Sequence, residues 1–228
     1  MTDWDTMARP EKALARDYIF DSLGRHQSGL FLPAGQCLCV RKALDYGVLD
    51  RDSHIVAVER DVDVAHIMRR TLATLPVSST VHEGQLHTLQ LDQPLDLAFI
   101  DLNGLLDANI ARWVYHELAP NLSPDAAVIF TLAHSWRNNR FMPNCQRYLL
   151  RHRYEFVDAL ADELSCHDMD LVCTVALFRV LFHGWSFKTA YRLRYRDQGS
   201  VSMDAYRLYD FTKTNDTMGR IAHGLAIA

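Results

Sequence analysis

Short apolar runs alternate with amphipathic stretches along the first 132 residues. The apolar runs predict strands at 30–32, 54–58, 77–82, 95–102 and 126–132. Residues 95–102 (LDLAFIDL) are nearly all apolar, which is typical of a strand buried on both faces. Apolar positions at helical spacing predict helices at 10–23, 40–46, 62–75 and 109–118. Strands that alternate with helices in this way predict an α/β protein with a parallel sheet.

The pattern changes after residue 137. Helices are expected at 144–153 and 158–164, and the apolar run at 171–182 fits either a helix or a strand. Two tyrosine-rich alternating segments follow, at 187–196 and 202–212, with Asp197-Gln198-Gly199-Ser200 between them. This order predicts a hairpin. The expected fold is a Rossmann-like, mostly parallel seven-stranded sheet with helices on both faces and a C-terminal antiparallel hairpin.

This fold implies one main domain. We expect it to span residues 28–213 and to include a helical segment at about 138–183. Residues 1–27 would form an N-terminal tail and helix, and residues 214–228 a weakly specified C-terminal tail. No internal repeat divides the chain.

The segment 29–61 predicts a strand, a turn, a helix and a second strand. Pro33 has no N–H for a ladder and Gly35 can take a positive φ, so the first strand should end there. Gly47 suits the position just after the helix. Glu59 then ends the second strand. In nucleotide-binding α/β folds an acid at this place reaches a ribose hydroxyl.

Composition excludes few classes of protein. The chain has 228 residues, 49% of them hydrophobic, and a formal charge of −4, to which residues 1–130 contribute −7 and residues 131–228 contribute +3. No apolar run reaches the ~18 residues of a membrane span, and the N-terminus has no apolar signal core. The five cysteines are odd in number and scattered, at 37, 39, 145, 166 and 173. We therefore expect a cytoplasmic protein with reduced thiols, no membrane contact and no disulfide framework.

With these positions in place, residues 28–135 and the hairpin resemble the class I S-adenosylmethionine-dependent methyltransferases. LFLPAG at 30–35 falls where that family has its first strand and glycine-rich turn. Glu59 falls at the ribose-binding acid, and EGQL at 83–86 falls at the loop that passes the adenine. DLNG at 101–104 falls at the tip of the fourth strand, where the family places catalytic groups. The first loop is a degenerate form of the family's G-x-G-x-G pattern, because it keeps only Gly35.

The resemblance implies S-adenosylmethionine as the cofactor and assigns residues to it. The expected cofactor-binding residues are Pro33, Ala34, Gly35, Glu59, Arg60, Gly84, Gln85 and Leu86. The backbone at Ala34 and Gly35 would face the methionine part. Asp101 and Asn103 are the expected catalytic residues, with Asp101 orienting the acceptor or acting as a base. Trp136, Arg137 and Arg140 are expected to bind the substrate.

Arginines suggest what the acceptor is. Arg147 and Arg151 lie four apart, on one face of an expected helix, and Arg192, Arg194 and Arg196 share one face of an expected strand. Such surfaces suit phosphates of DNA or RNA, although an ordinary solvated face would have the same pattern.

Two other functions remain open. A non-catalytic relative of the same fold could bind a protein or nucleic-acid partner as a regulatory protein. A nicotinamide-dependent oxidoreductase is a third alternative, although the chain lacks G-x-G-x-x-G.

The eleven histidines show no ligand spacing, so no metal is expected.

Overall fold

The computed structural model describes residues 10–102, 106–133, 141–152, 157, 160–162, 168–196, 202–215 and 219–227. Within them, seven strands form one sheet, in the order β3-β2-β1-β4-β5-β7-β6. The strands are β1 Ser28–Phe31, β2 His54–Glu59, β3 Ser78–Glu83, β4 Leu95–Asp101, β5 Leu122–Ala133, β6 Trp185–Arg196 and β7 Ser202–Lys213. β1 to β5 pair in parallel, and β7 runs antiparallel between β5 and β6. The predicted fold class is confirmed.

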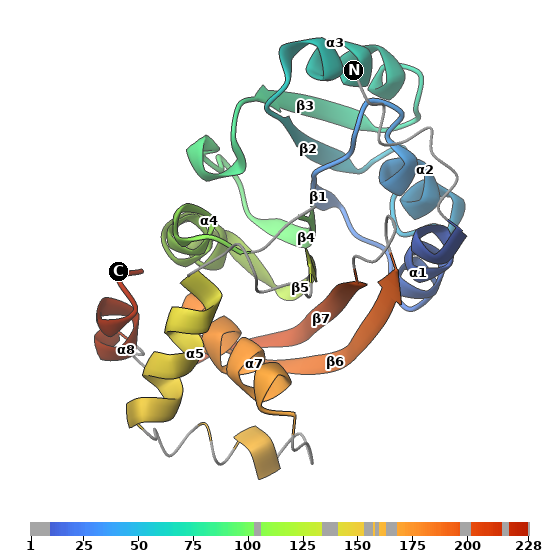
Figure 1. Cartoon of the computed structure of the whole chain (residues 1–228). Coiled ribbons are helices and arrows are strands. Elements are labelled where there is room, and N and C mark those ends of the chain that lie inside the picture. Colours follow the sequence, from blue (N-terminus) through green and yellow to red (C-terminus); the bar gives the residue numbers. More distant parts are fainter. Residues whose placement is uncertain are drawn as a thin grey trace.

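The helices cover both faces of the sheet (Figure 1). They are α1 Pro10–Asp21, α2 Leu38–Asp45, α3 Val62–Leu72, α4 Ala108–Trp113, α5 Phe141–His152, α7 Met169–Leu181 and α8 Gly219–Gly224. Short turns of other helical types lie at Leu86–Thr88, Val114–Leu118 and Ala119–Asn121. The ambiguous run at 171–182 therefore belongs to a helix.

Alternate residues of the central strands enter two separate cores, because side chains alternate across a sheet. Phe31, Leu97 and Phe99 face α1, α2 and α3, and the Phe99 ring lies 5.1 Å from that of Phe20 on α1. Ile100 and Phe130 face α4 and α7.

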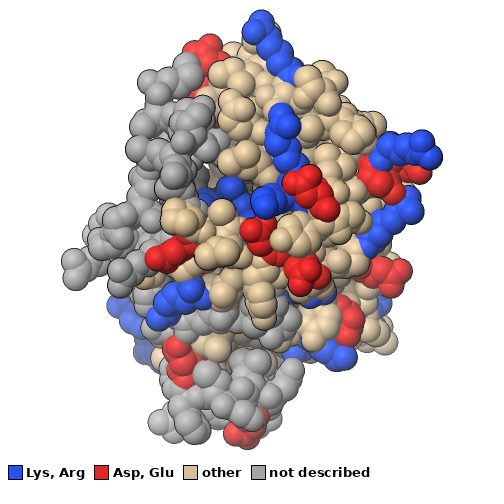
Figure 2. Space-filling model, turned by 90° about the vertical axis from the view of Figure 1, so that its right-hand side faces the viewer, with Lys and Arg blue, Asp and Glu red and all other residues tan. Residues whose placement is uncertain are grey.

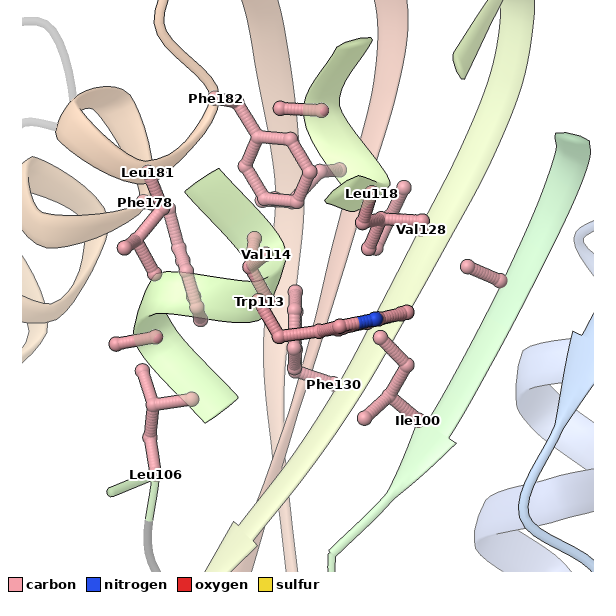
Figure 3. Close-up of a cluster of buried hydrophobic side chains, with 14 of the residues drawn as sticks. Ile100, Leu106, Trp113, Val114, Leu118, Val128, Phe130, Phe178, Leu181 and Phe182 are labelled. Atoms are coloured by element: carbon pink, nitrogen blue, oxygen red, sulfur yellow. The ribbon is translucent and has the colours of Figure 1, made fainter. Parts of the chain in front are cut away.

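In that second core the Phe130 and Phe178 rings stack at 5.0 Å (Figure 3). These two cores fix the strands whose ends carry the expected site.

The chain differs from the expectations at two places. Gly35 does not take a positive φ; Cys37, two residues later, takes φ 52° at the start of α2. In the segment expected as a tail, Gly219–Gly224 form α8, and Ala222, Leu225 and Ile227 are buried. The predicted turn at 197–200 and most of the predicted helix at 158–164 lie outside the described residues.

Candidate functional site

The strand order reverses direction between β1 and β4. β1 leads through α2 to β2 on one side, whereas the chain from β3 crosses to β4 on the other. α2 and α3 cover one face of the sheet and α4 the opposite face, so the connections diverge at this point (Figure 1). In open α/β sheets, ligands bind at such a switch point, outside the carboxyl ends of the strands. The expected site residues of β1, β2, β3 and β4 that the structure describes lie at these ends or just after them.

The β1–α2 turn is compact. Pro33 and Gly35 are buried, Ala34 is half-buried, and the Cys37 N–H donates to the Ala34 carbonyl at 2.9 Å. The carbonyl of Gly35 accepts from Thr71 Oγ1 at 2.8 Å. A Cβ at Gly35 would stand 3.1 Å from Ile67 Cγ2. The glycine therefore allows the turn to pack against α3, rather than supplying a left-handed turn.

Glu59 ends β2 and is half-buried. Its carboxylate accepts from the Asp61 N–H at 2.9 Å, which fixes the side chain near the start of α3. Asp61 in turn caps α3 by accepting from the N–H groups of Asp63 and Val64. Arg60 is exposed. The turn thus holds the Glu59 carboxylate at the tip of β2, whereas the Asp61 carboxylate caps α3.

The loop after β3 is tied to the same tip. The Gly84 N–H donates to the Glu59 carbonyl at 2.9 Å. A Cβ at Gly84 would lie 2.8 Å from His82 Nε2, so glycine fits where the loop turns closely over this ring. Gln85 is exposed and Leu86 is buried in the core. Glu59 and the loop expected to contact adenine are therefore neighbours.

Asp101 ends β4 and is nearly buried beneath α1. Lys12 Nζ lies 3.0 Å and Arg16 Nη2 3.7 Å from Asp101 Oδ2, and the Thr131 hydroxyl donates to Oδ1. Burial alone would raise the pKa of Asp101, but the two cations and the Thr131 bond hold that pKa below its usual range. The carboxylate is therefore ionised and engaged on both oxygens.

The pairing of Lys12 and Arg16 with Asp101 was not predicted from the sequence. Their spacing of four places both on one face of α1, beside the buried Ala15 and Ile19. A cation on the apolar stripe of a helix has to find a buried acid, and this signal could have pointed to a strand-end carboxylate.

Four expected residues lie outside the described residues: Asn103, Trp136, Arg137 and Arg140. Of the two arginine surfaces, Arg147 and Arg151 are exposed on α5. Arg194 instead makes a two-bond ion pair with the buried Asp204, at 2.8 and 3.2 Å.

Figure 2 looks onto the side of α1 and α2, where basic and acidic side chains are mixed. No single sign of charge therefore dominates this face. In the part of the chain that the structure describes, no helix has the length and apolar composition that crossing a membrane requires.

No protein-family model and no curated protein sequence matches the chain. Solved structures do. The N-methyltransferase NodS from Bradyrhizobium japonicum WM9 is 13% identical, with a TM-score of 0.52 over 88% of this chain and 96% of that one. The O-methyltransferase TomG from Streptomyces achromogenes, solved in complex with SAM, is 13% identical, with a TM-score of 0.50 over 90% of this chain and 82% of that one. The chain has the fold of class I S-adenosylmethionine-dependent methyltransferases.

Proposed function

We propose that this protein is an S-adenosylmethionine-dependent methyltransferase whose cofactor site lies at the switch point between β1 and β4. The observation that carries the proposal is the placement of Glu59. Its carboxylate stands at the tip of β2, held by the Asp61 N–H at 2.9 Å, and its carbonyl is bonded to Gly84 of the next loop.

The residues present fit the cofactor. Glu59 is half-buried, and a carboxylate held by one N–H keeps lone pairs for the two ribose hydroxyls. Gln85 and Leu86 follow Gly84 and would line the adenine. Pro33, Ala34 and Gly35, with Arg60 at the rim, would border the remainder of the ligand. The Nε of Arg16, a residue whose guanidinium lies 3.7 Å from Asp101 at the β4 tip, is buried without an acceptor among the described residues and fits an anionic group of the ligand.

The cofactor supplies a methyl group on a sulfonium, which is already activated. The acceptor's proton would pass to a base or to water. The protein therefore has to align the acceptor and exclude competing geometries.

The role of Asp101 stays a prediction, but the contacts of its carboxylate limit which role it can have. A carboxylate whose pKa is lowered is a weak proton acceptor, and Lys12, Arg16 and Thr131 already engage Asp101. We therefore propose that it orients groups at the β4 tip, and that the proton leaves by another route. Asn103 and Trp136 remain the proposed acceptor-side residues.

A nucleic acid remains the proposed acceptor, supported by Arg147 and Arg151, which are exposed one turn apart on α5. Arg194 supports it less, because this side chain is paired with Asp204.

Isothermal titration with S-adenosylmethionine and S-adenosylhomocysteine tests the cofactor site. We expect micromolar binding of both by the wild-type protein and its loss in Glu59→Ala, because the ribose hydroxyls lose their acceptor. Asp45→Ala is the matched control, since Asp45 is an exposed carboxylate at the last residue of α2 and is none of the expected site residues.

The control should bind both ligands as the wild type does. No heat with either ligand at millimolar concentration would refute the proposal and favour the alternative, a non-catalytic binding protein of this fold. Unchanged binding in Glu59→Ala would show that Glu59 is only a solvated strand-end acid, and equal losses in the two variants would show a general effect of removing a charge.

A further inference from the structure

Arg16 lies at the mouth of the proposed cofactor site. β1 and β4 pair with Phe31 opposite Phe99, and continuing this register by two residues places Pro33 opposite Asp101. Arg16 Nη2 is 3.7 Å from Asp101 Oδ2. α1 therefore brings a guanidinium next to the β1–α2 turn, where the proposed ligand would pass.

The hydrogen-bonding capacity of Arg16 is largely unused. Its Nε is buried, and no described residue accepts a hydrogen bond from it. At 3.7 Å its one ion pair is too long for a hydrogen bond, whereas Lys12 approaches Asp101 to 3.0 Å. A buried donor without an acceptor is costly, so this arrangement favours a further anion.

Arg16 is also the accessible cation of the pair. Its side chain keeps 15% of its area exposed, against 6% for Lys12. Lys12 is the closer partner of Asp101, and Arg16 is the cation that is more open to a ligand.

Two backbone positions of the β1–α2 turn cannot donate to an anion. Pro33 has no N–H, and the Cys37 N–H is already donated to Ala34. A carboxylate at this turn would gain from a side-chain partner, and Arg16 supplies the planar pair of N–H groups that a carboxylate accepts in bidentate form.

We propose that Arg16 binds the carboxylate of the cofactor's amino-acid part beside the β1–α2 turn. The inference rests on the proposed cofactor site, but a ligand without the carboxylate tests the two separately. 5′-Methylthioadenosine keeps the adenosine and the sulfur of S-adenosylhomocysteine and lacks its amino-acid end.

The experiment compares the Kd of S-adenosylhomocysteine with that of 5′-methylthioadenosine by titration calorimetry. We expect the wild type to prefer S-adenosylhomocysteine by about tenfold or more, because one charge-assisted bidentate pair is lost with the carboxylate. Arg16→Met should remove most of this preference and leave the Kd of 5′-methylthioadenosine unchanged. Glu59→Ala should weaken both ligands together.

Three further variants separate binding from folding. Arg16→Lys keeps the charge and should retain part of the preference. Asp101→Asn removes the competing carboxylate and should keep or strengthen it. Lys42→Met removes a cation that pairs with Asp17 of α1 at 2.7 Å, away from Asp101, and should change neither Kd. Circular dichroism confirms that each variant is folded.

Each of the other possible outcomes would contradict the role of Arg16, the cofactor site, or both. If the wild type binds both ligands equally, or Arg16→Met keeps the preference, the role of Arg16 is refuted while the cofactor site stands. If neither ligand binds the wild type, both proposals fail. If Arg16→Met weakens both ligands equally, Arg16 only holds α1 in place.

Discussion

Asp101 should make the stability of the protein depend on pH. Lys12 and Arg16 hold its pKa in the folded protein below the unfolded value of about 3.9. The carboxylate therefore stabilises the fold fully above that value, and its contribution is lost as the pH falls through the lower folded pKa. The unfolding free energy from urea titrations should drop steeply as the pH is lowered from about 4 to about 2.

Asp101→Asn supplies the comparison for this prediction. At pH 7 the variant should lose on the order of 3 kcal/mol of unfolding free energy, because it leaves two nearly buried cations without their carboxylate. The gap between the two proteins should close as the pH falls. Parallel pH curves would show that Asp101 is not the group whose titration matters.

Residues at the site could be predicted unequally well. The place of Glu59 at the end of β2 could be predicted, because a polar residue that ends an apolar strand can be recognised locally. Lys12 and Arg16 were missed because their partner, Asp101, lies far along the chain, and only the packing of α1 against β4 brings them together. Local patterns specify which residue ends a strand, but they do not say which helix covers that end.

The element β1 depends on one glycine. Phe31 is fully buried, and its ring lies over Gly29, where an added Cβ would come within 2.7 Å of Cε2. Gly29→Ala should therefore destabilise the protein by about 2 kcal/mol, because the core around Phe31 and Phe99 leaves the ring little room to move. Urea unfolding measures the change.

Gly24→Ala is the matched control, because nothing lies within 4 Å of the corresponding Cβ. Its unfolding free energy should stay within about 0.5 kcal/mol of wild type. Equal losses in the two variants would indicate that the cost comes from the backbone and not from the contact with Phe31.

Elements were predicted well where one periodicity dominated. β4 and β5 were recognisable as continuous apolar runs, and both form at the centre of the sheet. The predicted helix at 109–118 instead becomes α4 followed by a π-type turn at Val114–Leu118. Val114 and Leu118 of this turn are buried in the core, so tertiary packing determines the local geometry.

At the scale of the whole molecule, the sheet order follows from rules of connection more than from any single residue. Right-handed crossovers and a terminal hairpin leave few ways to arrange five parallel strands. Sequence reasoning could therefore reach the fold class without a matching sequence. The acceptor cannot be inferred in the same way, because the surface around the β5 end depends on side chains that no periodicity places.

Nucleic-acid contact is the property of the whole surface that can be tested most directly. The double variant Arg147→Glu, Arg151→Glu should weaken binding to single-stranded RNA or DNA. In a fluorescence titration against salt, the slope of log Kobs on log salt should fall by about two, one for each arginine. Arg25→Glu, Arg51→Glu makes the same charge change with exposed arginines beside the amino ends of β1 and β2. If this control lowers the slope equally, the attraction is a general effect of net charge. If the wild type shows no binding at low salt, nucleic acid is not the acceptor.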